Sequence, residues 1–282
     1  MSIPYYHIDS FTDRLFSGNP AGVCVVRAFP PAAIMQKIAA ENRHSQTAFV
    51  VAKGAADFDL RWFTPEVEDD LCGHATLAAA HALALRGQSH WPIRFHTRSG
   101  VLTVERDGDV YEMDFPAWPA QPCDASDELF VGLGVSLRQV SKSRDYLVQL
   151  DNAEQVRTLV PDFAMLRRLD IGIGGVIVTA AGEGDTEGDT DYVARFFAPS
   201  VGIPEDPVTG SIQCTLAPYW SERLGSRNLR VRQLSPRGGE LRCRMEGSRV
   251  KIGGKARLYL HGAIELADAL DQANHGNEHL LL

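Results

Sequence analysis

The chain has 282 residues, of which 44% are hydrophobic and 23% are charged, and its formal net charge is -8. This composition is typical of a soluble globular protein with enough apolar residues for two domains. The acidic balance, and a sequence without any dense run of lysine and arginine, argue against a nucleic-acid-binding surface. A local site can still bind a small anion against the overall charge.

The termini and the cysteines indicate the compartment. The N-terminal sequence MSIPYYHIDSF lacks a basic stretch followed by an apolar run, so we expect no secretory signal. The longest run of small apolar residues, over 76–85, is shorter than the ~20 residues that cross a bilayer. The five cysteines are scattered, odd in number and without a CxxC pair, which favours reduced thiols. We therefore expect a cytoplasmic protein that does not associate with membranes.

Alternating and β-branched residues predict many short strands and few helices. In the first half the predicted strands cover 5–9, 22–26, 48–51, 60–63, 93–97, 101–106 and 110–115, with helices over 31–41 and 74–86. In the second half the predicted strands cover 146–151, 176–179, 192–197, 229–233, 240–245, 249–253 and 256–266, with helices over 163–169 and 212–224. A polar stretch over 119–129 is the expected linker. These elements predict an α+β fold.

The two halves of the sequence resemble each other. The stretch RWFTPEVEDDLCGHAT, which begins at Arg61, matches ARFFAPSVGIPEDPVTGS, whose first arginine is Arg195. The glycine turns that follow, at Gly73 and Gly210, match at nearly the same offset, with a short insertion in the second loop. Matches that keep their order over half a chain indicate two similar domains rather than a solenoid. We expect domains over 1–120 and 121–259, with 260–282 packing back onto the first.

Each half also places a glycine turn at the start of a predicted helix, CGHAT at 72–76 and DPVTGS at 206–211. The first-turn amides of a helix lack intrahelical partners and lie at the positive end of the dipole, so they bind carboxylates and phosphates. If the halves pack about a pseudo-twofold axis, both termini can face one cleft. The repeat therefore predicts an anion site.

His74 sits at the mouth of the first of these helices and has several interpretations. It can be a core histidine, since alanine and leucine fill the following turns, or it can belong to the site as a neutral imidazole that donates one hydrogen bond and accepts another. A metal site is disfavoured because His81 is the one other ligand at a useful spacing. A two-thiol mechanism through Cys72 is disfavoured because its counterpart in the repeat is Thr209.

Two further stretches are candidates for the site. Asp206 precedes a proline, so it is extended rather than helical, and it serves either as an acid/base group or as a helix cap. Thr209 and Ser211 are better placed for capping. The stretch ENRHSQTAFV over 41–50 gathers polar residues between a predicted helix and a predicted strand, which is either a site or a polar loop.

Four motifs together resemble the phenazine-biosynthesis PhzF-like isomerase family, whose fold is that of diaminopimelate epimerase. They are FSGNPAGV at 16–23, SQTAF at 45–49, RWFTPEVEDDLCGHAT at 61–76 and EDPVTGS at 205–211. The resemblance spans nearly the whole chain. It implies two homologous domains, each a β-sheet wrapped around a central helix, related by a pseudo-twofold axis, with the active site between them. It also implies a cytoplasmic homodimer that uses no metal or organic cofactor.

Characterised members of this family move a proton along the conjugated system of a dihydro-hydroxyanthranilate. The resemblance implies that His74 and Asp206 bind substrate and assist the proton transfer. It further implies that the substrate carboxylate is bound by Ser45, Gly73, Gly210 and Ser211. The family's principal acid/base is a glutamate after the serine of its NxSET motif, and here that position is Gln46.

The glutamine leaves three interpretations of function. The first is a cofactor-independent isomerase or epimerase for a small carboxylate, in which His74 and Asp206 handle the proton and Gln46 orients the substrate. The second is a catalytically inactive relative that binds a small carboxylate ligand, because a glutamine side chain cannot carry the proton. The third is a structural or interaction protein with a vestigial site.

Overall fold

The computed structural model describes residues 2–88, 90–172, 174–182 and 190–266, and it divides into two compact units. Among the described residues, the first unit combines residues 2–8 with Pro20–Val104 and residues 258–266. The second unit combines Asp9–Asn19 with Glu105–Arg257. Each unit is built from non-contiguous segments, so the chain passes repeatedly from one to the other.

In the first unit β2 pairs with β3 in parallel, and β3 pairs with β4 antiparallel. β4 then pairs antiparallel with β5 and in parallel with β6, which pairs antiparallel with β7. β1 pairs with β2 and with β18. The strands are β1 (Ser2–Ser10), β2 (Asn19–Val26), β3 (Gln46–Ala52), β4 (Asp57–Phe63), β5 (Glu68–Asp69), β6 (Ile93–Thr97), β7 (Gly100–Asp107) and β18 (Ala256–Glu265).

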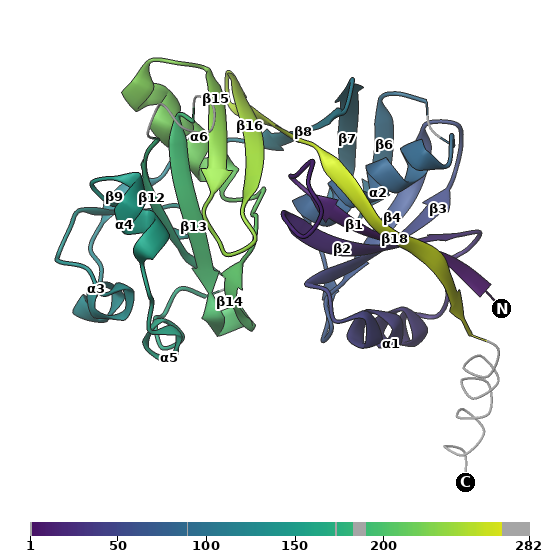
Figure 1. Cartoon of the computed structure of the whole chain (residues 1–282), viewed down its shortest axis with the longest axis horizontal. Coiled ribbons are helices and arrows are strands. Elements are labelled where there is room, and N and C mark those ends of the chain that lie inside the picture. The colour runs from purple at the N-terminus through teal and green to yellow at the C-terminus, as the bar shows by residue number, and fades with distance from the viewer. Residues whose placement is uncertain (1, 89, 173, 183–189, 267–282) are drawn as a thin grey trace, which may run out of the picture. The chain divides into compact units, whose positions relative to one another are not determined.

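Two helices pack on this sheet (Figure 1). α2 (Gly73–Leu85) is buried along most of its length, from His74 to Ala80 and again at Ala82 and Leu83. A helix whose faces are nearly all small and apolar is stable only when it is enclosed, which is the position of α2 among the strands. α1 (Ala32–Asn42) instead buries one face, with Ile34, Met35 and Ile38 in a core cluster.

In the second unit β11 pairs with β12 in parallel, and β12 pairs with β13 antiparallel. β13 then pairs antiparallel with β14 and in parallel with β15, which pairs antiparallel with β16. The strands are β8 (Val110–Pro116), β9 (Gln121–Cys123), β10 (Val140–Lys142), β11 (Tyr146–Gln149), β12 (Val176–Ala181), β13 (Tyr192–Ala198), β14 (Ile203–Asp206), β15 (Asn228–Gln233), β16 (Gly239–Glu246) and β17 (Arg249–Gly254).

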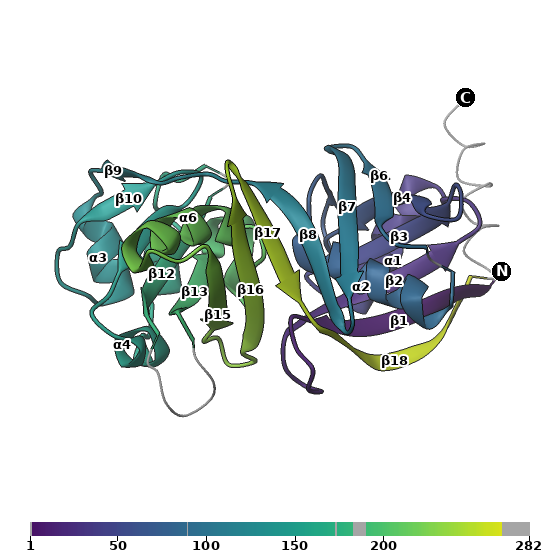
Figure 2. The ribbon, with the colours of Figure 1, turned by 90° about the horizontal axis from the view of Figure 1, so that it is seen from above.

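The central helix of the second unit is α6 (Gln213–Leu224), which packs on β15, β16 and β17 (Figure 2). Three short helices and a 3-10 turn complete the unit: α3 (Asp127–Leu133), α4 (Ala153–Thr158), α5 (Phe163–Leu166) and η1 (Pro199–Val201). They cover a separate apolar cluster that includes Leu129, Phe130, Val156 and Phe197.

The order of pairings is the same in the two units, strand for strand, so the internal repeat is a structural one. The matching arginines occupy matching positions. Arg61 on β4 forms a bidentate ion pair with Glu68 on β5, with N–O distances of 2.6 and 2.7 Å. Arg195 on β13 forms the same pair with Glu205 on β14, at 2.7 and 2.9 Å. The α+β fold with a sheet around a central helix in each unit is confirmed.

The structure also differs from the sequence prediction in places. The stretch 119–129, expected to be a linker, contains β9 and the start of α3. The short helices α3 and α4 were not predicted, because a single turn or two leaves no sustained 3.6-residue period in the sequence. Among the residues that the model describes, no helix has the length and apolarity to span a membrane. The predicted packing of 267–282 lies outside the described residues.

Candidate functional site

α2 begins at Gly73 because the preceding residue, Cys72, has an extended backbone with φ of -142°. The Cys72 side chain makes no capping hydrogen bond to the helix. The carbonyl of Cys72 instead accepts a 2.6 Å hydrogen bond from the hydroxyl of Thr76. The N–H groups of the first turn have no partners within the helix, and they lie at the positive end of its dipole. This terminus has the chemistry of an anion site.

His74 lies in this first turn with 6% of its surface exposed. Its Nε2 is 3.2 Å from the hydroxyl oxygen of Ser45, and its Nδ1 is 3.4 Å from the sulfur of Cys72. Burial, together with the positive charge of nearby His44, lowers the pKa of His74 to about 3. The imidazole is therefore neutral at physiological pH. Its hydrogen-bond partner Ser45 is the first residue of the SQTAF motif.

Gln46, the first residue of β3, is 7% exposed and does not contact His74 through any hydrogen bond in the described structure. Its side-chain Nε2 donates to Asp69 Oδ2 at 3.2 Å. Its Oε1 is fully buried, and no hydrogen-bond partner for it exists among the described residues. A buried carbonyl oxygen without a donor is costly, so it points to a group that arrives from outside the chain.

Asp69, at the end of β5, is held by the loop that leads into α2. Its Oδ1 accepts the backbone N–H of Asp70 at 2.8 Å and that of Leu71 at 3.4 Å. The side chain is half-buried. These bonds orient the carboxylate, and its second oxygen faces the Gln46 amide.

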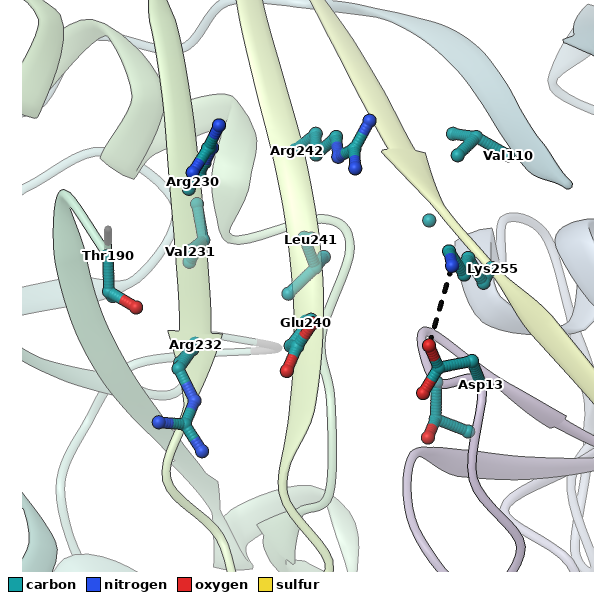
Figure 3. Close-up of a pocket in the computed structure, with 12 residues that line it drawn as sticks. Asp13, Val110, Thr190, Arg230, Val231, Arg232, Glu240, Leu241, Arg242 and Lys255 are labelled. Atoms are coloured by element: carbon teal, nitrogen blue, oxygen red, sulfur yellow. Dashed lines mark hydrogen bonds and ion pairs between the residues drawn. The ribbon is translucent and has the colours of Figure 1, made fainter. Parts of the chain in front are cut away.

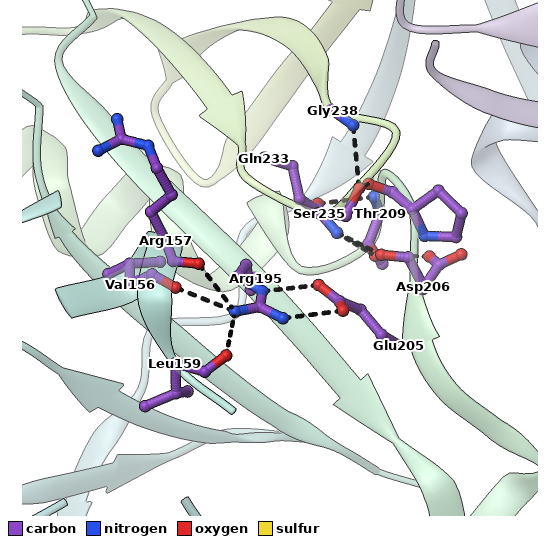
Figure 4. A network of polar contacts seen from close by, with 11 residues as sticks. Val156, Arg157, Leu159, Arg195, Glu205, Asp206, Thr209, Gln233, Ser235 and Gly238 are labelled. Carbon is purple, nitrogen blue, oxygen red and sulfur yellow. Dashed lines mark hydrogen bonds and ion pairs between the residues drawn. The ribbon is translucent and has the colours of Figure 1, made fainter. Parts of the chain in front are cut away.

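In the second unit, Asp206 occupies the end of β14, before the turn into α6 (Figure 4). It is 7% exposed. Its Oδ1 accepts the side-chain N–H of Asn19 at 2.8 Å, and its Oδ2 accepts the hydroxyl of Thr209 at 2.5 Å. Burial raises the pKa of Asp206 to about 6, against the opposing effect of these two hydrogen bonds. The carboxyl group therefore titrates close to neutral pH.

A buried amide supports Asp206 and its turn. Gln233 donates to the backbone carbonyl of Asp206 at 2.7 Å, and its Oε1 accepts the backbone N–H of Thr209 at 2.8 Å. Ser235 donates to the carbonyl of Pro207 at 2.7 Å. The backbone groups of the turn that Gln233 and Ser235 contact therefore all have hydrogen-bond partners. These bonds hold the turn, and with it the Asp206 carboxylate, in place.

The neighbouring glutamate is tied down differently (Figure 4). The guanidinium of Arg195 holds both oxygens of Glu205 and also donates to the carbonyls of Val156 and Leu159, at 3.2 and 2.7 Å. A bidentate ion pair of this kind fixes the strand end on which Asp206 sits. Glu205 is thus neutralised by Arg195, whereas Asp206 has no ion-pair partner among the described residues.

Gly210 and Ser211 precede α6, which begins at Gln213 with Ile212 as its N-cap and no side-chain capping bond. The expectation that Thr209 or Ser211 caps this helix is therefore wrong. The hydroxyl of Thr209 turns back to Asp206, because a buried carboxylate is the stronger acceptor. A turn with N–H to C=O bonds from Gln213 to Gly210 and from Cys214 to Ser211 leads into the helix.

Sequence reasoning missed two residues, Asn19 and Asp69. Asn19 lies inside the motif FSGNPAGV, but its contact with Asp206 spans 187 positions of sequence. Asp69 could have been identified from the internal repeat of the sequence. Its offset from Asp206 in the sequence equals the offset between Gly73 and Gly210. The repeat therefore pairs the two aspartates as it pairs the two glycine turns.

The described surface also has a pocket of about 270 Å³ within the second unit (Figure 3). Arg230 and Arg232 from β15 and Arg242 from β16 line it, together with Lys255. Lys255 forms ion pairs with Asp13 and Asp109 at 3.4 and 2.9 Å. None of the predicted site residues lines this pocket, so we do not assign the chemistry to it. Within the ranges that the structure describes, no three histidine, cysteine, aspartate or glutamate side chains are grouped to hold a metal ion.

The chain was compared with known proteins. Residues 8–262 match the family model described as phenazine biosynthesis-like protein. An uncharacterized isomerase of Pseudomonas aeruginosa is 46% identical, over 94% of this chain and all of the relative. A crystal structure of a PhzF-family phenazine biosynthesis protein from Enterococcus faecalis superposes with a TM-score of 0.89 at 43% identity, and covers 94% of this chain and 100% of that one.

A more distant likeness concerns the fold alone. The structure of a hydroxyproline epimerase from Agrobacterium vitis superposes with a TM-score of 0.59 at 12% identity, over 95% of this chain and 94% of that one. The architecture is thus shared with epimerases of very different sequence. The match over most of the chain, the close relatives and the two-unit α+β fold together show that this chain belongs to the phenazine biosynthesis-like (PhzF) family.

Proposed function

We propose that the protein is a cofactor-independent isomerase or epimerase that moves a proton on a small carboxylate-bearing substrate. The observation that carries the proposal is Asp206, a buried carboxylate with a raised pKa of about 6 and no arginine or lysine in hydrogen-bond contact among the described residues. A structural carboxylate in such a position is normally neutralised by a cation, as Glu205 is. A group that titrates near neutral pH can both accept and donate a proton during turnover.

His74 has a different role in this proposal. With a pKa lowered to about 3 it does not hold a second proton at neutral pH. Its neutral ring donates one hydrogen bond and accepts one, and thereby binds the substrate and stabilises the negative charge that develops when a C–H bond is broken. Ser45 orients the ring through Nε2.

Helix-opening amides bind the substrate carboxylate. Gly73 supplies such an amide in the first unit, and Gly210 and Ser211 are its counterparts in the second. The positive ends of the helix dipoles favour an anion there. Gln46 orients the substrate through its unpaired Oε1, which accepts a hydrogen bond from a substrate N–H or O–H group.

The test is hydrogen exchange in D2O, followed by proton NMR. The panel contains α-amino acids in both enantiomers, the corresponding α-hydroxy acids and a dihydro-hydroxyanthranilate. We expect the protein to exchange a C–H proton of at least one compound, and we expect Asp206→Asn and His74→Gln to lower that rate by at least 100-fold, the lower end of what acid/base groups contribute. Asp13→Asn, on an exposed side chain of the other pocket, is the matched control and should leave the rate unchanged.

One observation favours a second candidate function, a protein that binds a small carboxylate without turnover: Gln46 has no proton to give in the position of the family's glutamate. Isothermal titration calorimetry with the same panel separates the two. Binding of a panel member with no exchange of any C–H proton would support the inactive binder and refute the isomerase. Exchange by the wild-type protein refutes the binder.

A further inference from the structure

The two aspartates Asp69 and Asp206 occupy equivalent positions of the repeat. Each ends a short strand that pairs antiparallel with the long strand before it. In the first unit Asp69 pairs with Trp62, and in the second unit Asp206 pairs with Phe196. Each aspartate is followed, four residues later, by the glycine of the turn that leads into the buried helix.

The residue before each aspartate is neutralised, and the aspartate is not. Glu68 is bound by Arg61, as Glu205 is bound by Arg195. Among the described residues, neither aspartate takes part in an ion pair. Both units therefore carry an acidic side chain at this position without an ion-pair partner among the described residues, and for the buried Asp206 this is unusual in a purely structural role.

Each aspartate is instead held by a buried carboxamide whose own oxygen has no donor. Gln46 Nε2 donates to Asp69 at 3.2 Å, and Asn19 Nδ2 donates to Asp206 at 2.8 Å. Gln46 Oε1 and Asn19 Oδ1 are both buried without a hydrogen-bond partner in the described structure. Gln46 is 7% exposed and Asn19 is fully buried. Each unit thus contains the same arrangement, in which an aspartate accepts a hydrogen bond from a side-chain amide whose own oxygen has no donor in the described structure.

We propose that Asp69 is a proton-transferring group of the first unit and performs the task for which Gln46 lacks a proton. The assignment rests on the proposed function. The Asp69 carboxylate accepts the proton of a substrate C–H bond, whose electron pair stays on the substrate. Solvent supplies the proton to the carbon at which the new C–H bond forms. Loss of the proton from Asp69 to solvent restores the carboxylate, so no oxidant, reductant or co-reactant is required.

The Gln46 amide suits a neighbour that changes protonation state. Its Nε2 donates to the ionised carboxylate, and after a half-turn of the amide its Oε1 accepts from the protonated form. Asn19 lacks this freedom, because its Nδ2 also donates to the carbonyl of Val208 at 2.8 Å. Gln46 can therefore follow the proton on Asp69, whereas Asn19 fixes Asp206 in one place.

The experiment moves the carboxylate between the two neighbouring positions. The probe is the panel compound that the wild-type protein exchanges fastest. We expect Asp69→Asn to lower kcat for exchange by at least 100-fold and to change KM by less than about 3-fold, because acid/base groups typically contribute ~10²–10⁴-fold to the rate. The asparagine keeps Oδ1 for the backbone N–H groups of Asp70 and Leu71, so the loop into α2 is preserved. The double variant Gln46→Glu/Asp69→Asn returns a carboxylate beside the old one, and we expect it to recover at least 10-fold of the lost rate.

Asp70→Asn is the matched control, since Asp70 is the exposed neighbour in the same loop, and its rate should stay within about 2-fold of wild type. Near-wild-type exchange by a folded Asp69→Asn protein would overturn the role of Asp69 and leave the proposed function standing. So would a loss of rate that the double variant does not repair. If the wild-type protein exchanges no compound of the panel, the proposed function fails, and the role of Asp69 fails with it.

Discussion

Asp206 couples its ionisation to folding, since burial raises its pKa from 3.8 to about 6. Below about pH 3 the carboxyl is protonated in the folded and unfolded chains alike, and its full contribution to stability is present. As the pH rises, the unfolded chain ionises first, and the folded state loses stability until the pH passes about 6. A shift of this size corresponds to about 3 kcal/mol.

Asp206→Asn should remove this loss. We expect the free energy of unfolding of the variant, relative to wild type, to rise by about 3 kcal/mol between pH 3 and pH 7. Urea unfolding at both pH values measures the change. Parallel pH dependence of the two proteins would show that Asp206 ionises in the folded state as it does in water.

His74 should not titrate in the physiological range. Burial and the charge of His44 lower its pKa to about 3, so we expect the ring nitrogens of His74 to keep the ¹⁵N chemical shifts of a neutral imidazole from pH 5 to pH 8. A titration step near pH 6.5 would contradict this and would restore His74 as a proton carrier.

At the residue scale, motifs in the sequence marked candidate site residues, whereas contacts between strands left no signal. His74 and Asp206 were predicted because each precedes or opens a helix in a recognisable glycine turn. The pairing of Gln46 with Asp69 was not predictable from either motif. It depends on β4 lying between β3 and β5, so that residues on two different strands meet across a third.

Among the elements, the segment Asp9–Asn19 is held by tight backbone geometry at Gly18. Gly18 has φ of +72°, and a Cβ there would lie 2.3 Å from the carbonyl oxygen of Ser10 and 2.6 Å from Thr12 Cγ2. Its N–H donates to the carbonyl of Gly238 at 2.8 Å. The next residue is Asn19, so this geometry also sets the donor for Asp206.

Gly18→Ala should therefore destabilise the fold by about 2–4 kcal/mol, through left-handed strain and the backbone clash together. Gly108→Ala is the matched control. Gly108 also has positive φ, but nothing lies within 4 Å of its Cβ position, so only the conformational cost of ~1 kcal/mol remains. Thermal unfolding of both variants measures the difference, and equal losses would mean that the clash relaxes without cost.

The ion pairs at the ends of β5 and β14 differ in the number of arginines that bind the glutamate. Glu205 is bound by Arg195, whereas Glu68 is bound by Arg61 and also by Arg98, at 2.7 Å. We expect Arg195→Ala to cost about 3–5 kcal/mol, because it leaves a partly buried carboxylate without any cation, and Arg61→Ala to cost clearly less. Denaturant titration of the pair tests the ranking. The reverse order would mean that Glu205 is readily hydrated when its partner is removed.

Helices and strands were predicted accurately where the local sequence pattern was strong. The strand at 93–97 and the starts of both buried helices came out nearly as observed, since alternation and glycine turns mark them. The helices α3 and α4 escaped because each is only one or two turns long and is stabilised by the apolar cluster around Phe197 rather than by its own period.

For the whole molecule, the segment Asp9–Asn19 belongs to the second unit although it follows the first strand of the chain. Phe11 is fully buried there, its N–H donates to the carbonyl of Lys255 at 2.7 Å, and its carbonyl accepts the N–H of Glu240 at 2.9 Å. No local pattern predicts such an exchange of segments, because the partners lie near opposite ends of the sequence. The homodimer and the cytoplasmic location stay predictions.

A fragment of residues 105–257 should not unfold cooperatively. It lacks Phe11, Asn19 and the Asp9 carboxylate that binds Arg237 at 2.9 Å, so part of its core and the partner of Asp206 are missing. Circular dichroism during urea titration is the measurement, and a synthetic peptide of residues 9–19 added in excess should sharpen the transition. A fragment as cooperative as the full chain would show that the segment contributes little to the unit.

The same interleaving constrains the order in which the protein can form during translation. Domains generally fold as units while the chain leaves the ribosome. The first unit includes β18 (Ala256–Glu265), which pairs with β1 (Ser2–Ser10), so this pair cannot form until residues 256–265 have emerged. Nascent chains that end before β18 would display the open edge of β1, a template for pairing with other chains. Covering that edge is thus a task that β18 performs for the finished sheet.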